Sequence, residues 1–386
     1  MNTATHRGLP ATPPAREALR RGLAEAWAKA GAIAVVLAVL CSPPEPSRAQ
    51  GSAAEAPCDI ATTERVVAIG DVHGAYDRFV AMLRAANLID NRQRWIGARA
   101  RLVQTGDVLD RGPDSRKVID LLRKLDNEAS RAGGRVHALL GNHEFMRLVG
   151  DWRYVSAGEF KAFQTADSAD LRDRVREMNA DLAAKRARAE KREFNEREYR
   201  AQFLKDFPLG YFDMQIAFGK EGEYGKWVRS RPAAVRINGV LFMHGGVSNM
   251  VADLGCEGLN AEVQRNLTAV PVPAEQLTSL LSSREDGPLW YRGMASEPEA
   301  SFEPMLDSIL RRFNVRAVVI GHTPVATGQI TTRFGGRVVL IDTGMLNGEF
   351  FPKGAASALE MQGSSLAAVY EDGRRVPLTA PLLATK

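Results

Sequence analysis

Short apolar runs that end in a glycine and a polar side chain recur along most of the chain. In the stretch RVVAIGDVHG, the apolar run Val66–Ile69 leads directly into Gly70, Asp71 and His73. Short runs rich in β-branched residues and bounded by turn residues are typical of buried strands. The same pattern returns in the segments ARLVQTGD (100–107), RVHALLGN (135–142), GVLFMHGG (239–246), VRAVVIGH (315–322) and RVVLIDTG (337–344). The sequence therefore predicts a series of buried strands, each followed by a polar turn.

Amphipathic stretches follow several of these predicted strands. In SRKVIDLLRKLDNEA (115–129), one helical face carries Val118, Leu121, Leu122 and Leu125. Apolar positions at this spacing predict a helix that packs against a sheet. Strands that alternate with such helices form layered α/β domains, whose ligand sites lie outside the carboxyl ends of the strands. We therefore expect an α/β fold with a site built from the polar residues of the turns.

A charge-dense segment interrupts this pattern between residues 156 and 206. It contains the stretch LRDRVREMNADLAAKRARAEKREFNEREYRAQFLKDF, which mixes basic and acidic residues and has no glycine or proline. This composition predicts long exposed helices. We expect a mostly helical insertion over residues 156–230, which forms either a solvated face or a partner-binding arm.

The first fifty residues have the composition of a targeting segment. Basic residues precede the apolar run AGAIAVVLAVLC (30–41), and a proline-rich stretch with small residues follows. This order is typical of a secretory signal peptide, with cleavage after Ala49 or as late as Ala56. We expect residues 1–49 to be removed and the protein to be exported to the periplasm, without stable membrane insertion after cleavage. An uncleaved N-terminal membrane anchor and an upstream start codon are the alternatives.

Composition and charge restrict the class of protein and of partner. Of the 386 residues, 45% are hydrophobic and 25% are charged, as in globular proteins with a large core. The net charge is +5, but the first 49 residues hold six basic and three acidic residues, so the remainder carries only +2. This balance does not favour nucleic acid as a partner. Without the leader two cysteines remain, Cys58 and Cys256, which permit a disulfide in an exported protein or form two free thiols.

The predicted turns contain residue types that bind metals or transfer protons. Imidazole, carboxylate and amide groups together suit divalent ions such as Mn, Fe or Zn. A single Asp or His has no such meaning, because each is common in turns for structural reasons. The repeated placement of His or Asp with Gly after a buried strand favours a joint site. The candidates are Asp71, His73, Asp107, Asp110, Arg111, Asn142, His143, Glu144, His244 and His322.

These turns resemble the signature blocks of the metallophosphoesterase (calcineurin-like) superfamily, in its phosphoprotein-phosphatase branch. The blocks are GDVHG, GDVLDRG and GNHE, followed by single histidines in HGG and GHTP. The stretches GNHEFMRLVGDWRYV, EYGKWVRSRP and LIDTGM are similar to those of Shewanella-like bacterial protein phosphatases. Several blocks in a fixed order are more specific than any one motif. The resemblance covers residues 64–362 and implies a four-layer α/β/β/α sandwich, with a catalytic domain over residues 60–365.

The resemblance implies a site for two divalent metal ions, with Mn, Fe or Zn as candidates. Two ions that share a water molecule can deprotonate it and can neutralise phosphoryl oxygens during in-line attack. The nucleophile is then a hydroxide activated by both ions. The implied ligands are Asp71 and His73 for the first ion, Asp107 as a bridge, and Asn142, His244 and His322 for the second ion.

The resemblance also implies residues for proton transfer and substrate binding. Arg111 would bind phosphate oxygens with its planar guanidinium group, and Asn142 would also contact the substrate. His143 would protonate the leaving oxygen as a general acid, with Asp110 holding its ring. Glu144 is expected to stabilise the turn.

One block differs from that of the eukaryotic enzymes of this branch. Those enzymes carry a second phosphate-binding arginine between the last two metal-binding histidines. Arg292 in GPLWYRG is the candidate for this role here, with Arg284 as the next choice. The C-terminal block of the eukaryotic enzymes is also replaced, by LIDTGMLNGEFF, so their inhibitors and regulatory subunits are not implied for this chain.

The sequence thus predicts a metal-dependent phosphomonoesterase that acts on phosphorylated protein, peptide or small phosphomonoester substrates, with Tyr or Ser/Thr left open. A diadenosine-polyphosphate pyrophosphohydrolase or a phosphodiesterase is the alternative, because these enzymes share the fold and the ligands. Arg111 favours a monoester, since its cation suits a dianionic terminal phosphate. A non-catalytic metal-binding scaffold is disfavoured, because every expected ligand and His143 are present.

Overall fold

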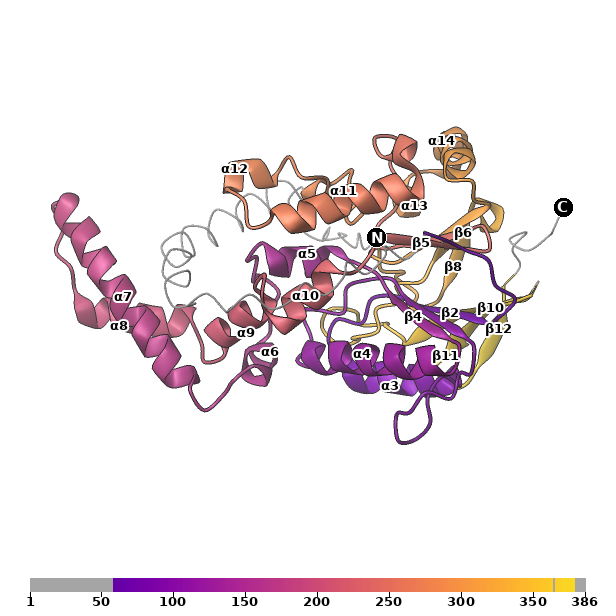
Figure 1. Cartoon of the computed structure of the whole chain (residues 1–386). Coiled ribbons are helices and arrows are strands. Elements are labelled where there is room, and N and C mark those ends of the chain that lie inside the picture. Colours follow the sequence, from indigo (N-terminus) through magenta and orange to yellow (C-terminus); the bar gives the residue numbers. More distant parts are fainter. Residues whose placement is uncertain (1–57, 364, 379–386) are drawn as a thin grey trace, which may run out of the picture.

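A computed structural model of the chain describes residues 58–363 and 365–378 (Figure 1). The expected leader, residues 1–49, lies outside the described residues. Within them, the strands form two six-stranded sheets. The strand order is β12-β11-β10-β2-β3-β4 in the first sheet and β1-β5-β6-β7-β9-β8 in the second. No helix of the described residues is long and apolar enough to cross a membrane.

The first sheet has three parallel strands at one side. Strand β2 pairs in parallel with β3, and β3 pairs in parallel with β4. Strand β10 adds antiparallel to the other edge of β2. The strands are β2 (Val66–Ile69), β3 (Arg101–Gln104), β4 (Arg135–Ala138), β10 (Ser357–Gln362), β11 (Ser365–Tyr370) and β12 (Arg375–Pro377). The first three are predicted by the apolar runs of the sequence.

The second sheet also has three parallel strands, at its centre. Strand β6 pairs in parallel with β7, and β7 with β9, while β5 and β8 add antiparallel on either side. The strands are β1 (Asp59–Ile60), β5 (Ala234–Ile237), β6 (Val240–Met243), β7 (Ala317–Ile320), β8 (Thr331–Arg333) and β9 (Val338–Leu340). In both sheets, the polar turns predicted by the sequence follow the parallel strands.

The two sheets face each other, and helices cover their outer faces. Alternate residues of β2 point to opposite faces, so Val66 and Ala68 join the apolar cluster between the sheets, which also contains Phe242 of β6. Val67 and Ile69 belong to the cluster under the helices. Helices α3 (Tyr76–Ala85) and α4 (Ser115–Arg131) lie on the first sheet, and α11 (Gly255–Ala269) and α14 (Glu299–Arg312) lie on the second (Figure 1). This arrangement confirms the predicted α/β/β/α sandwich.

Helix α4 forms where the sequence predicts it and extends two residues further, to Arg131. Val118, Leu121, Leu122 and Leu125 are buried, as their spacing requires for a helix against a sheet. Each such side chain contributes about 1.5–3 kcal/mol when it is fully buried. The remaining short helices of the sandwich are α5 (Asn142–Leu148), η1 (Ala252–Leu254), α12 (Ala274–Leu277), η2 (Leu281–Ser283), α13 (Gly293–Ser296) and η3 (Phe334–Gly336).

The segment 156–230 is helical and lies to one side of the sandwich. Its helices are α6 (Ala157–Ala162), α7 (Ser168–Ala189), α8 (Glu196–Asp206), α9 (Tyr211–Phe218) and α10 (Glu223–Arg229). Helices α7 and α8 extend away from the sheets (Figure 1). They have their own small cluster, in which Val175 packs with Phe203, Phe207, Tyr211 and Phe212. About half of the residues of α7 and α8 are exposed.

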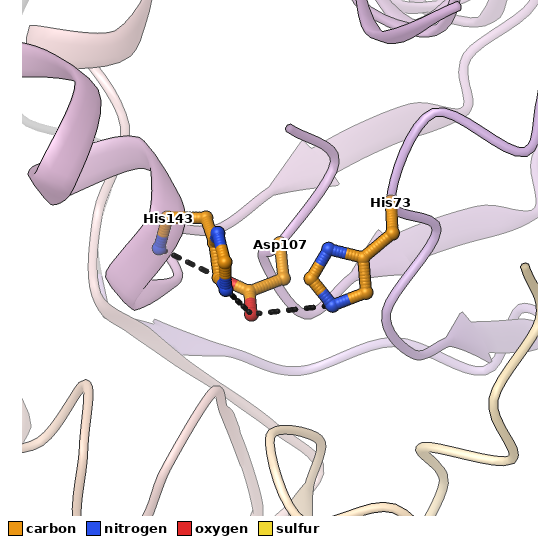
Figure 2. A group of neighbouring side chains, drawn as sticks. All are labelled: His73, Asp107 and His143. Carbon is orange, nitrogen blue, oxygen red and sulfur yellow. Dashed lines mark hydrogen bonds and ion pairs between the residues drawn. The ribbon is translucent and has the colours of Figure 1, made fainter. Parts of the chain in front are cut away.

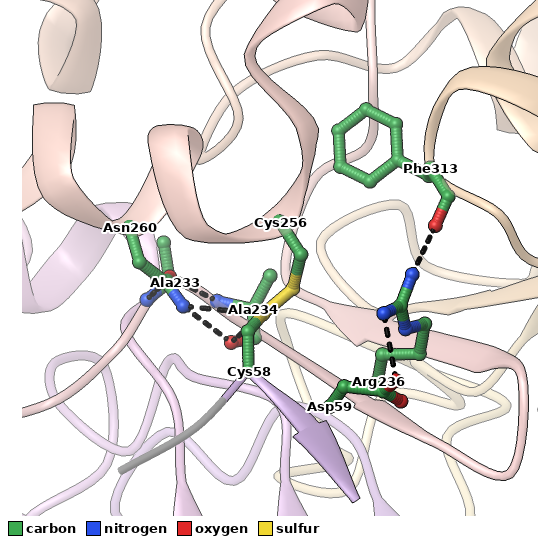
Figure 3. The surroundings of a disulfide bond; sticks show 8 residues. All are labelled: Cys58, Asp59, Ala233, Ala234, Arg236, Cys256, Asn260 and Phe313. Atoms are coloured by element: carbon green, nitrogen blue, oxygen red, sulfur yellow. Dashed lines mark hydrogen bonds and ion pairs between the residues drawn. A yellow bond between two sulfur atoms is a disulfide. The ribbon is translucent and has the colours of Figure 1, made fainter. Parts of the chain in front are cut away.

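A disulfide joins Cys58 to Cys256 (Figure 3). The Cα atoms are 6.0 Å apart, which is typical of disulfides, and the two residues are separated by 198 positions. The bond links the start of β1 to α11. Next to it, the side chain of Asn260 accepts hydrogen bonds from the backbone N–H groups of Ala233 and Ala234 and donates to the carbonyl of Ala234. The bridge that the sequence permits is therefore present and ties the edge of the second sheet to its covering helix.

Candidate active site

The polar residues that follow the parallel strands meet at one edge of the two sheets. The turns after β2 and β3 and the start of α5 come from the first sheet, and the turns after β6 and β7 come from the second. The carboxyl ends of parallel strands lie at the same edge, which brings their turns together. The buried residues at this edge are Asp71, His73, Asp107, Asp110, Asn142, His143, His244 and His322. The structure thus gathers the residues that the sequence predicts for metal binding and proton transfer.

Several of these residues have an unusual backbone conformation. The φ angles of His73, Asp107, Asp110, Arg111 and His322 are 47°, 55°, 69°, 68° and 64°. A residue other than glycine in this left-handed region costs on the order of 1–3 kcal/mol. The surrounding sheets must offset this cost, and such strain gathers at functional sites.

Two glycines of the first turn have different roles. Gly74 has a φ of 66° and allows the turn after His73. Gly70 has no such φ, and a β-carbon at its position would overlap the carbonyl oxygen of Ile341. Gly70 is therefore required for close packing between the sheets.

The carboxylate of Asp107 lies between two imidazole rings (Figure 2). Its Oδ2 is 3.7 Å from Nε2 of His73 and 3.8 Å from Nε2 of His143. Its Oδ1 accepts a hydrogen bond of 3.0 Å from the backbone N–H of His143. Oδ2 of Asp71 is 3.9 Å from the same Nε2 of His73. These side chains present several donor atoms to one small volume.

A second group of donors faces Asp107 from the other sheet. Nε2 of His244 lies 3.3 Å from Oδ2 of Asp107 and 3.0 Å from Oδ1 of Asn142. It also lies 3.1 Å from Nδ1 of His322. Two sets could hold a metal ion, and they share Asp107: one contains His73 and His143, and the other contains His244 and His322.

The sequence interpretation and the structure agree that Asp107 belongs to both sets. They differ in one ligand of the first ion. The sequence assigns Asp71 to the first ion, whereas the compact set around His73 contains His143. Asp71 remains close, since its Oδ1 accepts a hydrogen bond of 3.1 Å from the backbone N–H of His322. The exact ligand set of the first ion therefore stays a prediction.

The hydrogen bonds of the histidines fit metal ligation. Nδ1 of His73 lies 2.9 Å from the carbonyl oxygen of Leu109, and Nδ1 of His244 lies 2.9 Å from that of Thr105. Nε2 of His322 lies 3.1 Å from the carbonyl oxygen of Trp290. An N–H that donates to a backbone carbonyl leaves the opposite ring nitrogen with its lone pair for a cation. In His73 and His244 that second nitrogen faces a carboxylate, and in His322 it faces Nε2 of His244.

The charges of the site also favour a cation. Burial opposes the charge on Asp107, but the facing imidazoles, His244 foremost, outweigh burial and hold the pKa of Asp107 well below its usual range. Burial likewise opposes the charge on His244, yet Asp107 and Asp71 raise the pKa of His244 to about 9. Burial, followed by a neighbouring positive charge, lowers the pKa of both His73 and His322. The site thus combines the ionised carboxylate of Asp107 with the neutral imidazoles of His73 and His322, which suits a divalent ion. A bound cation would replace the extra proton that His244 holds.

His143 and Asp110 form a hydrogen-bonded pair beside these donors. Nδ1 of His143 lies 2.6 Å from Oδ2 of Asp110, and both side chains are buried. Burial opposes the charge on Asp110, but Arg147 and His143 outweigh it and lower the pKa of Asp110. Asp110 is therefore the acceptor and holds the ring, so that Nε2 of His143 points toward Asp107. This arrangement matches the pair that the sequence predicts.

Arg111 borders the site between two aromatic rings. Its guanidinium carbon lies 5.5 Å from the ring centre of Tyr154 and 5.6 Å from that of Phe351. Its Nη1 contacts Nε2 of His73. The same two rings lie beside the histidines. The ring centre of Tyr154 is 5.2 Å from that of His143, and the ring centre of Phe351 is 6.2 Å from that of His73. The sequence pattern does not reveal these rings, because both lie in loops far apart in the chain.

The two candidates for a second phosphate-binding arginine are in different positions. Nη1 of Arg292 donates to the carbonyl of His322, at 2.7 Å, and to Oγ1 of Thr323, at 3.1 Å. Arg284 instead forms a two-pronged ion pair with Asp286, at 2.7 and 2.8 Å. Arg292 is therefore the arginine that the structure brings to the site.

Two further carboxylates support the turns. Glu144 accepts hydrogen bonds from the backbone N–H groups of Gly141, Asp107, Val108 and Leu109, which agrees with the structural role that the sequence suggests. Asp342 follows β9 and is buried. Burial raises the pKa of Asp71, and the negative charge of Asp342 is the next largest cause. The sequence candidates do not include Asp342, although the segment LIDTG has the same pattern of a strand followed by Asp and Gly.

Comparison with known proteins identifies relatives over most of the chain. The calcineurin-like phosphoesterase family model matches residues 64–326. Shewanella-like protein phosphatase 2 of Arabidopsis thaliana is 30% identical over 292 residues, which cover 74% of this chain and 72% of that protein. Shewanella-like protein phosphatase 1 of Plasmodium berghei is 28% identical over 288 residues, which cover 73% of this chain and 67% of that protein.

A solved structure shares both the fold and part of the sequence. The crystal structure of a cold-active protein-tyrosine phosphatase from a psychrophilic Shewanella species is 28% identical to this chain. The two superpose with a TM-score of 0.63, and the match covers 87% of each chain. The likeness therefore extends over the sandwich and beyond the turns of the site.

Proposed function

Because the chain belongs to the calcineurin-like phosphoesterase family, with relatives among the Shewanella-like protein phosphatases, we propose that it hydrolyses phosphate monoesters on protein or peptide side chains. One observation carries this proposal: two sets of buried donors share Asp107, one of them contains His143, which pairs with Asp110, and Arg111 contacts His73. These are the groups needed to activate water, protonate a leaving oxygen and bind a phosphoryl group.

The donor chemistry supports two divalent ions, with Mn, Fe or Zn as candidates. Asp71, His73 and Asp107 would hold the first, and Asn142, His244 and His322 would complete the second around Asp107. Bound ions would supply a hydroxide nucleophile at neutral pH and would neutralise the phosphoryl oxygens. The carbonyl hydrogen bonds of the histidine rings support this assignment, since they orient the ligand nitrogens in advance.

The chain's own residues would bind and release the substrate groups. Arg111 and Arg292 would grip phosphoryl oxygens, for which a planar fork is better suited than an ammonium group. Water would lose one proton to the solvent before it attacks, and the resulting hydroxide oxygen would bond to phosphorus as the bond from phosphorus to the leaving oxygen breaks. His143 would transfer the proton on its Nε2 to that leaving oxygen. Asp110 stays ionised and stabilises the ring throughout.

Within this class, we propose a preference for phosphotyrosine over phosphoserine. The rings of Tyr154 and Phe351 lie on either side of Arg111 and would contact an aryl group whose phosphate is held there. The likeness to the solved Shewanella protein-tyrosine phosphatase supports the same substrate.

Turnover by the purified protein with Mn²⁺ tests the proposal. The substrates are phosphotyrosine, phosphoserine and phosphothreonine peptides, an aryl phosphodiester and a dinucleoside tetraphosphate. We expect hydrolysis of the peptides, with kcat/KM for phosphotyrosine the highest. Faster hydrolysis of the diester or the dinucleotide would contradict a monoesterase and favour the alternative activities of the fold.

We also propose that the protein is exported. The N-terminal segment predicts a secretory signal, and the Cys58–Cys256 bridge supports an oxidising compartment. Fractionation of cells that produce the full chain, with sequencing of the mature N-terminus, tests this. A protein retained in the cytoplasm with residues 1–49 intact would contradict it.

A further inference from the structure

Arg147 is a buried guanidinium group one helical turn beyond His143. Both residues belong to α5, and a spacing of four places them on the same helical face. The side chain of Arg147 is 0% exposed. A buried charge requires charged or hydrogen-bonding partners, because its removal from water is costly. Its partners connect it to the proton-transfer pair.

Arg147 and His143 contact opposite oxygens of the same carboxylate. Nη2 of Arg147 donates to Oδ1 of Asp110, while Nδ1 of His143 lies 2.6 Å from Oδ2. Asp110 has a φ of 69°, a conformation that an aspartate adopts only with support from its surroundings. The orientation of the carboxylate, and with it that of the imidazole, therefore depends on Arg147.

Glu159 extends this contact into the helical segment. Its Oε1 accepts hydrogen bonds from Nη2 of Arg147, at 3.4 Å, and from the backbone N–H of Asp110, at 3.3 Å. Its Oε2 accepts from the backbone N–H of Ser156, in the capping box at the start of α6. Glu159 is thus held by its own helix cap while it holds both Arg147 and Asp110.

Aromatic and sulfur groups hold the guanidinium from other directions. Its carbon lies 5.2 Å from the ring centre of Trp152 and 5.1 Å from that of Phe218 in α9. Nη1 donates to the sulfur of Met214, also in α9, at 3.0 Å. A planar guanidinium that packs against rings keeps one orientation, which an ammonium group does not. Together with Glu159 of α6, these contacts from α9 mean that two helices of the segment 156–230 help to place Arg147.

We propose that Arg147 is a positioning residue for proton transfer by His143, and that Glu159 couples it to helix α6. Arg147 acts through Asp110 and does not touch the substrate. The inference rests on the proposed function in one respect, the role of His143 as the proton donor. The helical segment 156–230 would thus contribute to proton transfer, in addition to any contact that it makes with substrates.

The leaving-group dependence of kcat tests this role in the full chain loaded with Mn²⁺. The substrates are phosphate monoesters whose leaving groups range from nitrophenol through tyrosine to an alkyl alcohol. Since general acid catalysis is worth about 10²–10⁴-fold in all, Arg147→Met should lower kcat about 10–100-fold for the poorest leaving groups and less than about threefold for nitrophenyl phosphate. Arg147→Lys should recover part of the loss. An equal loss for every substrate would overturn the role.

Two further measurements separate positioning from general damage. In protein loaded with diamagnetic Zn²⁺, the proton NMR signal of the His143 Nδ1–H should shift or broaden in Arg147→Met with the metal content unchanged, and an unchanged signal would overturn the role. Arg176→Met is the matched control, since Arg176 is buried in α7 and pairs with Asp173 and Glu177. It should leave the leaving-group dependence unaltered.

Glu159→Gln keeps the test decisive if Arg147→Met does not fold. It should produce the same dependence with a smaller loss, about three- to tenfold for the poorest leaving groups, within the range available to general acid catalysis. A loss independent of the leaving group would overturn the role of the network. In an Asp110→Asn background, neither substitution should lower kcat further, because residues that act as a unit are not additive.

His143→Ala distinguishes failure of this inference from failure of the proposed function. The loss of kcat in His143→Ala can grow with the pKa of the leaving group while Arg147→Met and Glu159→Gln show no such trend. In that case, only the positioning role is rejected. If the loss in His143→Ala is equal for all substrates, His143 is not the proton donor, and the positioning role is rejected with it.

Discussion

Nε2 of His244 lies 3.3 Å from Oδ2 of Asp107, although the two residues come from different sheets. His244 follows β6 in the second sheet, and Asp107 follows β3 in the first. Each raises the stability of the other's charged form, as the low pKa of Asp107 and the raised pKa of His244 indicate. The site therefore forms only when both sheets are packed, and Asp107 is its central anion.

Asp107→Asn should abolish most of the activity and leave the fold intact. The substitution removes the negative charge that both donor sets share, so kcat/KM at saturating Mn²⁺ should fall by about 10³-fold or more. Asp307→Asn is a matched control, because Asp307 of α14 forms a partly buried pair with Arg337. Chelation should silence the wild type, and Mn²⁺ should restore it. Substantial turnover by folded Asp107→Asn would contradict the shared-carboxylate assignment.

His143→Ala should reduce turnover most for substrates with poor leaving groups. A tyrosyl or alkyl oxygen needs a proton as it departs, whereas nitrophenolate leaves almost unaided. The loss should therefore reach about 10²–10⁴-fold on phosphotyrosine or phosphoserine peptides and be markedly smaller on nitrophenyl phosphate. Asp110→Asn should follow the same trend more mildly. Elemental analysis checks that the metal content is unchanged; a loss explained by missing metal would instead make His143 a ligand.

Tyr154→Leu and Phe351→Leu should weaken the proposed preference for phosphotyrosine. An aromatic pair contributes about 0.5–1.5 kcal/mol, so each substitution should lower kcat/KM on phosphotyrosine peptides roughly two- to tenfold. The value on phosphoserine peptides should change little. Phe350→Leu is the matched control, because Phe350 is 52% exposed and is not one of the two rings that flank Arg111. Equal losses on both peptides would remove the rings from substrate choice.

Replacing Cys58 and Cys256 by serine should lower the free energy of unfolding by about 2–4 kcal/mol. The bridge spans 198 positions, and its removal releases a long loop in the unfolded chain. Urea denaturation of the double variant and of the reduced wild type should give the same decrease. Mass spectrometry without reduction checks that the bridge is present; two free thiols in protein from an oxidising compartment would contradict it.

The stability of the fold should depend on pH through His137 of β4. Burial, followed by the guanidinium groups of Arg101, Arg135 and Arg231, lowers the pKa of His137 from 6.5 to about 4. The unfolded chain binds this proton more readily, so the contribution is fully present above pH 6.5 and is lost as the pH falls toward 4.

A comparison with His137→Gln isolates this effect from other titrating groups. The difference in unfolding free energy between wild type and variant should decrease by at most about 3 kcal/mol between pH 7 and pH 4. This limit follows because a shift of one pKa unit corresponds to about 1.36 kcal/mol. Urea denaturation at several pH values measures it. A difference that does not change with pH would show that His137 has an ordinary pKa.

The strands of the sandwich could be predicted because their local pattern reports their burial. Val66–Ile69 is apolar at every position, as a parallel strand covered on both faces must be. The apolar stripe of α4 could be predicted for a related reason, because a helix on a sheet buries one face only. The prediction that the polar turns gather followed from these strands, since carboxyl ends of parallel strands share an edge.

Residues that act through long-range contacts could not be predicted in the same way. Tyr154 and Phe351 flank Arg111 from two loops, and no local period marks a residue whose partner is so distant in the chain. Arg147 had a weak signal, its spacing of four from His143. Glu159 had only the Ser-x-x-Glu pattern of a capping box, which predicts a helix start and not a contact with Arg147. Asp342 had the clearest signal among the residues left out, as an Asp directly after a predicted strand.

The sequence by itself determined the elements, the candidate donors and the family signature, because burial and turn formation are local demands on residue type. Tertiary structure alone decided that Asp107 lies between the imidazoles of both sheets and that Asp110 is held from two sides by His143 and Arg147. It also placed five site residues in the left-handed region, against their local preference. Such arrangements arise from packing between distant segments, whose energy outweighs the local cost.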